Sequence, residues 1–399
     1  MRYLLWGLAC WMLWGLTGCY IPASQNAATP FRQSTLLMAT PRTGQYYHGV
    51  YPGGTNGEED DITLSGQTLY ESLVGAQTAW VYFSNNWYTS RQFPLATASW
   101  IRAHGAVPYI RLMLRDSADV DFQYTVFTLQ AINAGVFDAD LRAWADSARA
   151  FGSPLIVEYG TECNGSWFGW NGNWVKDHAA GVAAFAAAYR HIVQLTRKEG
   201  AKNITWVFHV NTDDDPDVSW NHFENYYPGD DIIDWVGVSC YGAQTPLDTP
   251  PIPRLRDMLD ASYPRLQAMA PTKPVFLLEF GNTANNPYMQ PETWANDALT
   301  DIFANRWPNL AGFSWWNERF SNDDNPAHDT IMRMQDLPKL AQAFQQQLSA
   351  HNAQLLTRPQ FTPNLPSRKA GHALSTAAIR NPYAGRPCPT PNACRRRGR

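Results

Sequence analysis

A short segment in the middle of the chain places a carboxylate between an apolar stretch and a group of tryptophans. The segment is VEYGTECNGSWFGWNGNW, residues 157–174, and Glu162 stands where its apolar beginning ends. A second apolar stretch, residues 273–282, carries Glu279 near its end. Two carboxyl groups on opposite sides of a glycosidic bond can cleave it, because one protonates the leaving oxygen while the other attacks the sugar or activates water.

The elements that must position these glutamates form a regular series along the chain. Eight short apolar runs alternate with helical patterns such as residues 139–152 and 179–200, each closed by a glycine. This alternation predicts an α/β fold, a (β/α)8 TIM barrel. The alternative is an open doubly wound sheet, but the glycines of residues 46–57 do not fit the phosphate loop typical of such sheets. The predicted strands are Tyr47–Tyr51, Thr78–Phe83, Val107–Met113, Pro154–Glu162, Ile204–Val210, Ile233–Tyr241, Pro274–Phe280 and Leu310–Trp316.

The chemistry of such a barrel lies at the C-terminal ends of its strands. Glu162 on the fourth strand and Glu279 on the seventh therefore face each other across the predicted barrel mouth. The remaining strand ends supply His209, Asn211, Tyr241, Trp315, Trp316 and Asn317. Two glutamates surrounded by aromatic residues at a barrel mouth predict cleavage of glycosidic bonds.

Four segments of the chain look like parts of one known family: TECNGSWFGWNG, YYPGDDIIDWVGVSCYG, KPVFLLEFGN and GFSWWNE. They resemble glycoside hydrolase family 26, whose members are mostly β-mannanases, and the resemblance extends over about residues 47–316. It implies a retaining mechanism with Glu162 as acid/base and Glu279 as nucleophile, and a hydrogen bond from Tyr241 to the nucleophile. It also implies three sugar platforms, Trp167, Trp170 and Trp315.

A retaining mechanism requires two carboxyl groups roughly 5 to 5.5 Å apart, one protonated and one ionised. We expect desolvation beside Trp167 and Phe168 to raise the pKa of Glu162. We expect the Tyr241 hydroxyl to keep Glu279 an anion.

Two positions depart from the family pattern. Thr161 stands where the family usually has histidine, and Glu158 stands where arginine is common. The departures leave mannan specificity open. Alternation along the fourth strand predicts Glu158 beneath Glu162 on the inward face, where Arg111 of the third strand would neutralise it.

Further residues are expected to contact substrate. His209, Asn164 and Trp316 are predicted to bind it, although His209 equally fits a buried core histidine and Asn164 a residue that holds a turn. The acidic runs at residues 58–61 and 213–217 lack regular calcium-ligand spacing and are interpreted as solvated loops. The proposed reaction needs no metal and no cofactor.

The ends of the chain indicate export. Residues 1–18 combine an early positive charge with a short apolar stretch, which is typical of a signal peptide. Residues 16–19 resemble a lipobox, so that Cys19 would be acylated and would anchor the protein in the cell envelope, at the outer membrane or facing the periplasm. An ordinary cleaved signal is the alternative. We further predict a linker over 19–45, a barrel domain over 46–355 and a basic, disordered tail over 356–399.

Charge and cysteine content restrict the partners. Residues 357–399 hold nine Lys and Arg and no acidic residue, which leaves 22 basic against 35 acidic residues in the rest of the chain. An acidic body argues against a nucleic-acid partner, and a monomer is expected. Cys163 and Cys240 should be free thiols because a strand separates them, whereas Cys388 and Cys394 could close a loop in the tail.

These observations favour a retaining endo-glycosidase that acts on a β-linked polysaccharide: β-mannan, β-xylan, β-glucan or an exopolysaccharide. The alternative is a catalytically inactive carbohydrate-binding envelope lipoprotein, although a pure binder does not need both glutamates and Tyr241. A structural envelope protein would leave the aromatic cleft unexplained.

Overall fold

The structure is a computed structural model that describes residues 36–54 and 59–364. The predicted signal peptide, the predicted acylation site at Cys19, and Cys388 and Cys394 all lie outside the described residues. Within those residues, no helix is both long and apolar enough to cross a membrane.

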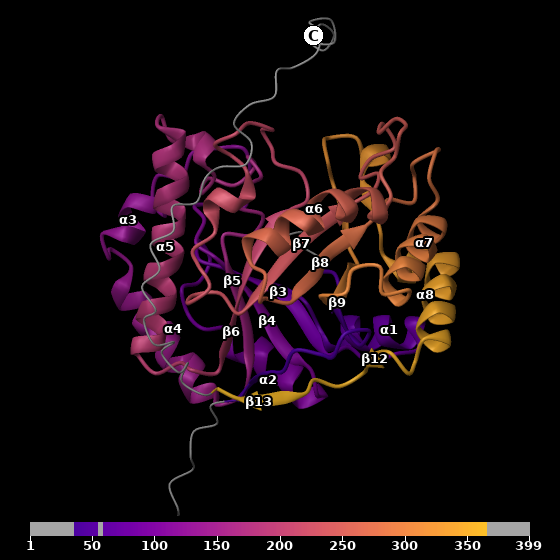
Figure 1. Ribbon diagram of the computed structural model, residues 1–399, viewed down its shortest axis with the longest axis horizontal. Coiled ribbons are helices and arrows are strands. Elements are labelled where there is room, and N and C mark those ends of the chain that lie inside the picture. The colour runs from indigo at the N-terminus through magenta and orange to yellow at the C-terminus, as the bar shows by residue number, and fades with distance from the viewer. Residues whose placement is uncertain (1–35, 55–58, 365–399) are drawn as a thin grey trace, which may run out of the picture. The chain divides into compact units, whose positions relative to one another are not determined.

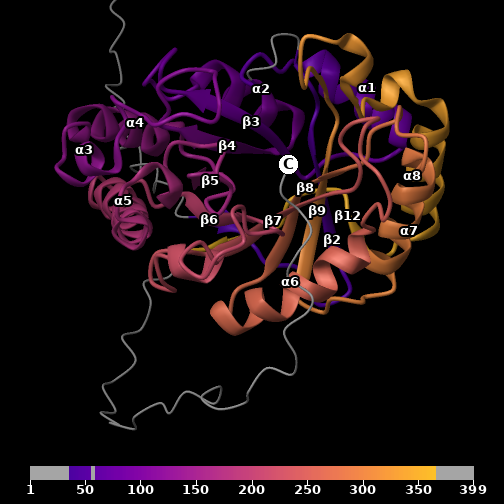
Figure 2. The same ribbon diagram turned by 90° about the horizontal axis from the view of Figure 1, so that it is seen from above.

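A closed barrel of eight parallel strands forms the centre of the fold (Figures 1 and 2). Each strand pairs with the next along the chain, and pairing of the first with the last, Tyr47 opposite Gly312 to Tyr51 opposite Trp316, closes the ring. The expected (β/α)8 barrel is confirmed, and two strands have the predicted bounds. The strands are β2 Tyr46–Tyr51, β3 Trp80–Asn86, β4 Val107–Met113, β5 Leu155–Tyr159, β6 Ile204–Asn211, β7 Trp235–Tyr241, β8 Val275–Gly281 and β9 Leu310–Trp316.

Helices connect the strands and cover the outside of the barrel (Figure 2). Their sequences explain their ends: the Asp177 side chain caps the first turn of α5 by accepting from Ala180 N, and α4 ends where Gly152 takes a φ of 69°. The helices are α1 Leu64–Val74, α2 Leu95–His104, α3 Leu129–Asn133, α4 Asp138–Phe151, α5 His178–Lys198, α6 Leu255–Met269, α7 Pro291–Phe303 and α8 Pro338–Ala350.

Aromatic side chains fill the lower part of the barrel. Trp235 stacks on Phe276 with ring centroids 4.0 Å apart, and Trp80 meets the same ring edge-on at 5.7 Å. Gly49 makes room for Trp80, because a Cβ at position 49 would lie 2.1 Å from the indole ring. These rings come from the first residues of β3, β7 and β8, and the candidate site lies at the opposite, C-terminal ends of the strands.

Short strands close the lower end of the barrel. β1 (Leu36–Met38) pairs antiparallel with β13 (Phe361–Pro363), and β12 (Leu355–Leu356) adds to the edge of β2. Ordered structure therefore extends into residues 36–45, predicted as linker, and residues 356–364, predicted as disordered tail. The physical reason is backbone pairing, which composition does not reveal; the Tyr47 hydroxyl also accepts a hydrogen bond from Gln360 N at 3.1 Å.

The two described cysteines are buried free thiols, as predicted. Cys163 follows β5 and Cys240 lies in β7, with β6 between these strands in the sheet.

Candidate active site

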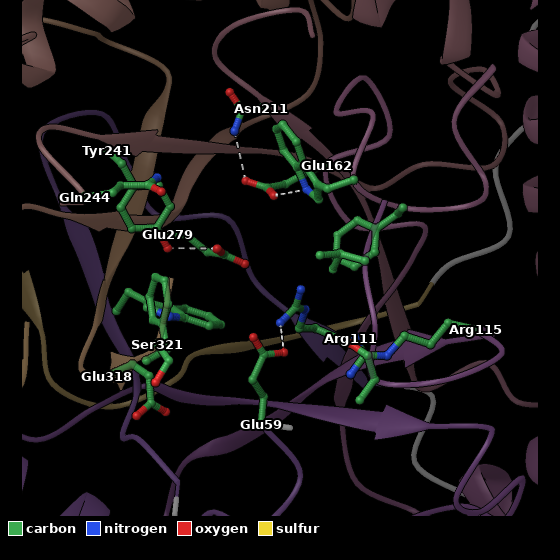
Figure 3. Close-up of a pocket in the computed structure, with 16 residues that line it drawn as sticks. Glu59, Arg111, Arg115, Glu162, Asn211, Tyr241, Gln244, Glu279, Glu318 and Ser321 are labelled. Atoms are coloured by element: carbon green, nitrogen blue, oxygen red, sulfur yellow. Dashed lines mark hydrogen bonds and ion pairs between the residues drawn. The ribbon is translucent and has the colours of Figure 1, made fainter. Parts of the chain in front are cut away.

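A cavity of about 490 Å³ opens where the C-terminal ends of the barrel strands meet (Figure 3). Both predicted catalytic glutamates line it, together with Tyr241 at the end of β7. Two aromatic residues that lie far apart in the sequence, Trp167 and Trp316, form parts of its wall. The polar pair and the aromatic surfaces expected at the barrel mouth therefore share one cavity.

Glu162 owes its position to a turn and not to a strand. β5 ends at Tyr159, and Gly160 and Glu162 take φ values of 67° and 48°. A left-handed backbone is unfavourable for a glutamate by about 1 kcal/mol or more, and such conformations often mark functional sites. The expectation that pleat alternation aligns Glu162 with Glu158 is therefore wrong, because the left-handed residues end the alternation.

Two N–H donors hold the Glu162 carboxylate. Trp167 Nε1 donates to Oε2 at 3.0 Å, and Asn211 Nδ2 donates to Oε1 at 3.0 Å (Figure 3). Asn211 is itself oriented, because its Oδ1 accepts from Asp213 N. Glu162 is 9% exposed, so the carboxylate reaches the cavity while its orientation stays fixed.

Glu279 lies on β8 and is almost completely buried. Tyr241 Oη donates to Oε2 at 2.9 Å, as the family resemblance implied (Figure 3), and Tyr82 Oη lies 3.1 Å from Oε1. Burial raises the pKa of Glu279 to about 7; Arg111 opposes this rise, and the Glu162 carboxylate adds to it. This raised pKa runs against the expectation that the Tyr241 hydroxyl keeps Glu279 an anion, because burial disfavours the charged form.

Arg111 of β4 is the buried cation beside the two glutamates. It forms an ion pair with Glu59 (Figure 3), its Nε donates to Thr161 Oγ1 at 3.2 Å, and Nε lies 3.7 Å from Glu158 Oε1. The predicted proximity of Arg111 to Glu158 is confirmed. Glu59 was not predicted as a site residue, because its acidic run suggested a solvated loop. Its place after the first barrel strand was the signal that could have indicated the barrel mouth.

Glu158 is fully buried below the cavity. Burial alone would raise its pKa, but His209 and Arg111, with hydrogen-bond donors including Thr161, lower the pKa to about 2. The nearest basic side chain is His209, whose Nδ1 lies 3.0 Å from Glu158 Oε2, whereas Arg111 Nε lies 3.7 Å from Oε1. Burial would lower the pKa of His209, but Glu158 outweighs it, and the pKa is raised.

Two predicted substrate-binding residues serve other purposes. His209 is fully buried between Glu158 and Ser239 Oγ, 2.7 Å from its Nε2, and does not line the cavity. Asn164 is buried as well and holds a turn: its Nδ2 donates to the carbonyl oxygens of Asn211 and Asp213. Both predictions of substrate contact are wrong because satisfied internal hydrogen bonds keep these side chains away from the cavity.

The tryptophans divide into two groups. Trp167 and Trp316 line the cavity, and Trp316 stacks on Tyr51 with ring centroids 4.2 Å apart. Trp315 is fully buried against Phe280, and its Nε1 donates to Met332 O. Trp170 is 1% exposed, and its Nε1 donates to Thr161 O. The expected sugar platforms at Trp170 and Trp315 are therefore wrong, because both rings belong to the core.

Several cavity residues were missed by sequence reasoning. Glu318 accepts hydrogen bonds from Tyr51 Oη at 2.7 Å and Gly54 N at 3.1 Å, and burial raises its pKa. Glu318 directly follows Trp315, Trp316 and Asn317, which were predicted at the barrel mouth, and this position could have indicated that Glu318 lines the cavity. The other missed residues include Arg115, Gln244 and Phe320.

One group of side chains has the composition of a metal site. Carboxylate or ring atoms of Asp214, Asp217 and His222 lie within 4.8 Å of one another. However, Arg265 pairs with Asp214 at 2.8 Å, and Asn164 Nδ2 donates to the same carboxylate. Arg265 and Asn164 thus already occupy the Asp214 carboxylate that such a metal ion would need.

Comparisons with known proteins agree with this architecture. A family model described as glycosyl hydrolase family 26 matches residues 115–257. Endoglucanase H of Acetivibrio thermocellus is 24% identical over 342 residues, which are 83% of this chain and 34% of that protein. Mannan endo-1,4-beta-mannosidase A and B of Caldalkalibacillus mannanilyticus is 26% identical over 166 residues, 41% of this chain and 28% of that protein. The chain thus spans about a third or less of these relatives' length.

A solved structure shares the fold. The family 26 β-mannanase from Bacteroides ovatus superposes with a TM-score of 0.52 at 16% identity, covering 78% of this chain and 90% of that one. At this identity the likeness concerns the barrel alone. The chain is thus similar in sequence to glycosyl hydrolase family 26 over residues 115–257, and it shares the barrel fold of a solved β-mannanase of that family.

Proposed function

We propose that the protein is a retaining endo-glycosidase that hydrolyses a β-linked polysaccharide by double displacement. The observation that carries this proposal is the pair of carboxyl groups, Glu162 and Glu279, in one aromatic-walled cavity, each with its own hydrogen-bond donors. An inactive carbohydrate binder has no need for a phenol and an indole directed at the two carboxylates.

In the first step, Glu162 gives a proton to the leaving glycosidic oxygen while a Glu279 oxygen attacks the anomeric carbon. In the second step, Glu162 removes a proton from a water molecule whose oxygen attacks the anomeric carbon, and the bond between that carbon and the Glu279 oxygen breaks. Asn211 and Trp167 hold Glu162 in one orientation for both steps. Tyr241 fixes the attacking carboxylate, so that little reorientation is needed in the transition state.

The substrate is proposed as a class. The cavity wall contains Trp167, Phe168, Trp316 and Phe320, which suit the flat faces of sugar rings. Relatives named as an endoglucanase and as a mannan endo-mannosidase differ in their polymer. β-Mannan, β-xylan, β-glucan and a bacterial exopolysaccharide therefore form the test panel.

The test is the release of new reducing ends from this panel by a soluble form that begins at Tyr20. The wild type should release them. Glu279→Ala should not, while Glu199→Ala, which removes a carboxylate at the end of α5 outside the cavity, should act like the wild type. Binding without release on every polymer would favour the sugar-binding lipoprotein instead.

The envelope location is a separate part of the proposal. It is supported by the lipobox-like residues 16–19 and the apolar stretch before them. Growth with an alkyne-labelled fatty acid should label the wild type and not Cys19→Ser, with the label in the outer-membrane fraction. A monomer is expected from light scattering of the soluble form.

A further inference from the structure

One hydroxyl group lies between three ionisable side chains below the cavity. Tyr82 Oη is 2.7 Å from Glu158 Oε1, 3.1 Å from Glu279 Oε1 and 3.2 Å from His209 Nδ1. All four side chains are at most 5% exposed. A phenol carries a single hydrogen, so Tyr82 can donate to Glu158 or to Glu279, but not to both at once.

The two carboxylates differ in how much they depend on that hydrogen. Glu158 also accepts from Tyr109 Oη at 2.6 Å, from the Thr161 hydroxyl and from His209 Nδ1. Glu279 receives, within the described part of the chain, one further protein hydrogen bond, from Tyr241. The hydrogen of Tyr82 therefore matters more to Glu279 than to Glu158, although Glu158 is the nearer acceptor.

We propose that Glu158 is a positioning residue that competes with the nucleophile Glu279 for the Tyr82 hydroxyl hydrogen. The inference rests on the proposed function, since it assigns Glu279 the nucleophilic role. When Glu279 is neutral, its own O–H donates to Tyr82, and Tyr82 donates to Glu158. When Glu279 is ionised, Tyr82 must turn away from Glu158 to donate to Glu279. The competition favours the neutral form and so sets the pH at which the nucleophile becomes available.

Other charges act on the same pair and must be separated from this effect. Replacement of Glu158 by glutamine removes one buried negative charge. It also removes the partner that contributes most to the raised pKa of His209, so the pKa of His209 should fall. Loss of the negative charge and a lower pKa of His209 act on Glu279 in opposite directions, and the Tyr82→Phe background separates both from the hydrogen bond. The groups that face Glu158 or Glu279 are Glu59, Tyr82, Tyr109, Arg111, Glu162, Tyr189, His209 and Tyr241.

The experiment is a double-mutant cycle on the full-length chain in detergent. In Glu158→Gln, the acidic limb of kcat/KM should move to lower pH by about half to one unit, the size of one hydrogen bond. In a Tyr82→Phe background, Glu158→Gln should produce no such shift. An equal shift in both backgrounds, or no shift in either, would overturn the proposal.

A second variant separates the length of the Glu158 side chain from its negative charge. Glu158→Asp keeps the buried negative charge beside His209 but withdraws the carboxylate from Tyr82 by one methylene. It should lower the acidic limb as Glu158→Gln does, and an unchanged limb would contradict the competition. This variant also serves if Glu158→Gln does not fold, which thermal unfolding reports.

An infrared titration tests the inference without turnover. The difference spectrum between wild type and Glu279→Gln isolates the Glu279 carboxyl band, and its midpoint should fall in the Glu158→Gln background. If no polymer is cleaved but this midpoint moves only when Tyr82 is present, the proposed function fails and the competition stands. If polymer is cleaved and the midpoint does not move, the competition fails and the function stands.

Discussion

Trp167 Nε1 donates to Glu162 Oε2 across 3.0 Å, from a position five residues further along the same loop. Trp167, which holds the proposed acid/base Glu162, therefore belongs to the same loop as Glu162. Gly165 allows the Trp167 ring to fold back toward Glu162, because a Cβ at position 165 would lie 2.1 Å from that ring. The short loop is therefore a self-contained unit whose indole serves both as hydrogen-bond donor and as cavity wall.

Trp167→Phe removes this donor but keeps an aromatic ring. We expect kcat/KM to fall about tenfold, because one hydrogen bond to a charged group is worth about 1.5 kcal/mol or more. Steady-state kinetics on the cleaved polymer measures the loss. Trp174→Phe is the matched control: its Nε1 donates to Ser166 O in the same segment, and its activity should be unchanged.

The pH dependence follows from the burial of Glu279. Because its pKa is raised to about 7 and the nucleophile must be ionised, kcat/KM should fall about tenfold per pH unit below neutrality. Initial rates between pH 5 and 9 test this, and a flat profile down to pH 5 would contradict the assignment of Glu279.

Glu59→Gln should move that acidic limb to lower pH. Glu59 raises the pKa of Glu279 and forms an ion pair with Arg111, whose charge lowers the same pKa. Both changes favour the ionised nucleophile, and we expect a shift of about one pH unit. Asp146→Asn breaks an ion pair on α4 at the protein surface and should leave the profile in place.

Stability should also depend on Glu279. A carboxyl group whose pKa is higher in the folded state binds protons more tightly there, so stability is lost as pH rises from the unfolded value near 4.5 through about 7. Complete loss corresponds to roughly 3 kcal/mol. Glu279→Gln does not titrate, so its advantage over the wild type in urea unfolding should be larger at pH 8 than at pH 5. Equal differences at the two pH values would contradict a buried, raised carboxyl.

The barrel was predictable because its signals are local. Eight apolar runs separated by amphipathic helices indicate the same fold even when the predicted strand bounds are wrong by a few residues.

Which side chains at the barrel mouth face the cavity is harder to predict. Trp315 and Trp316 are adjacent in β9 and point to opposite sides of the sheet, so that one lies in the core and the other lines the cavity. The sequence alone did not distinguish them.

The remaining differences come from interactions between distant segments. His209 is drawn below the cavity by Glu158 and Ser239, which lie 51 and 30 residues away in the sequence. Glu59 reaches the site because Arg111 and Ser84 hold its carboxylate. The hydrophobic periodicity of the sequence does not predict such hydrogen bonds between distant segments. They depend on which polar groups remain unsatisfied after the strands have paired.

The antiparallel pair β1–β13 determines where the ordered chain leaves the barrel. Its Phe361 shares a surface recess with Val107 and Pro154, at the starts of β4 and β5, and Figure 1 shows β13 below the strands. Leu36 is thus held at the end of the barrel away from the cavity. A tether attached before Leu36 would therefore begin at the end of the barrel opposite to the cavity, and a long polymer could reach the cavity without crossing the attachment point.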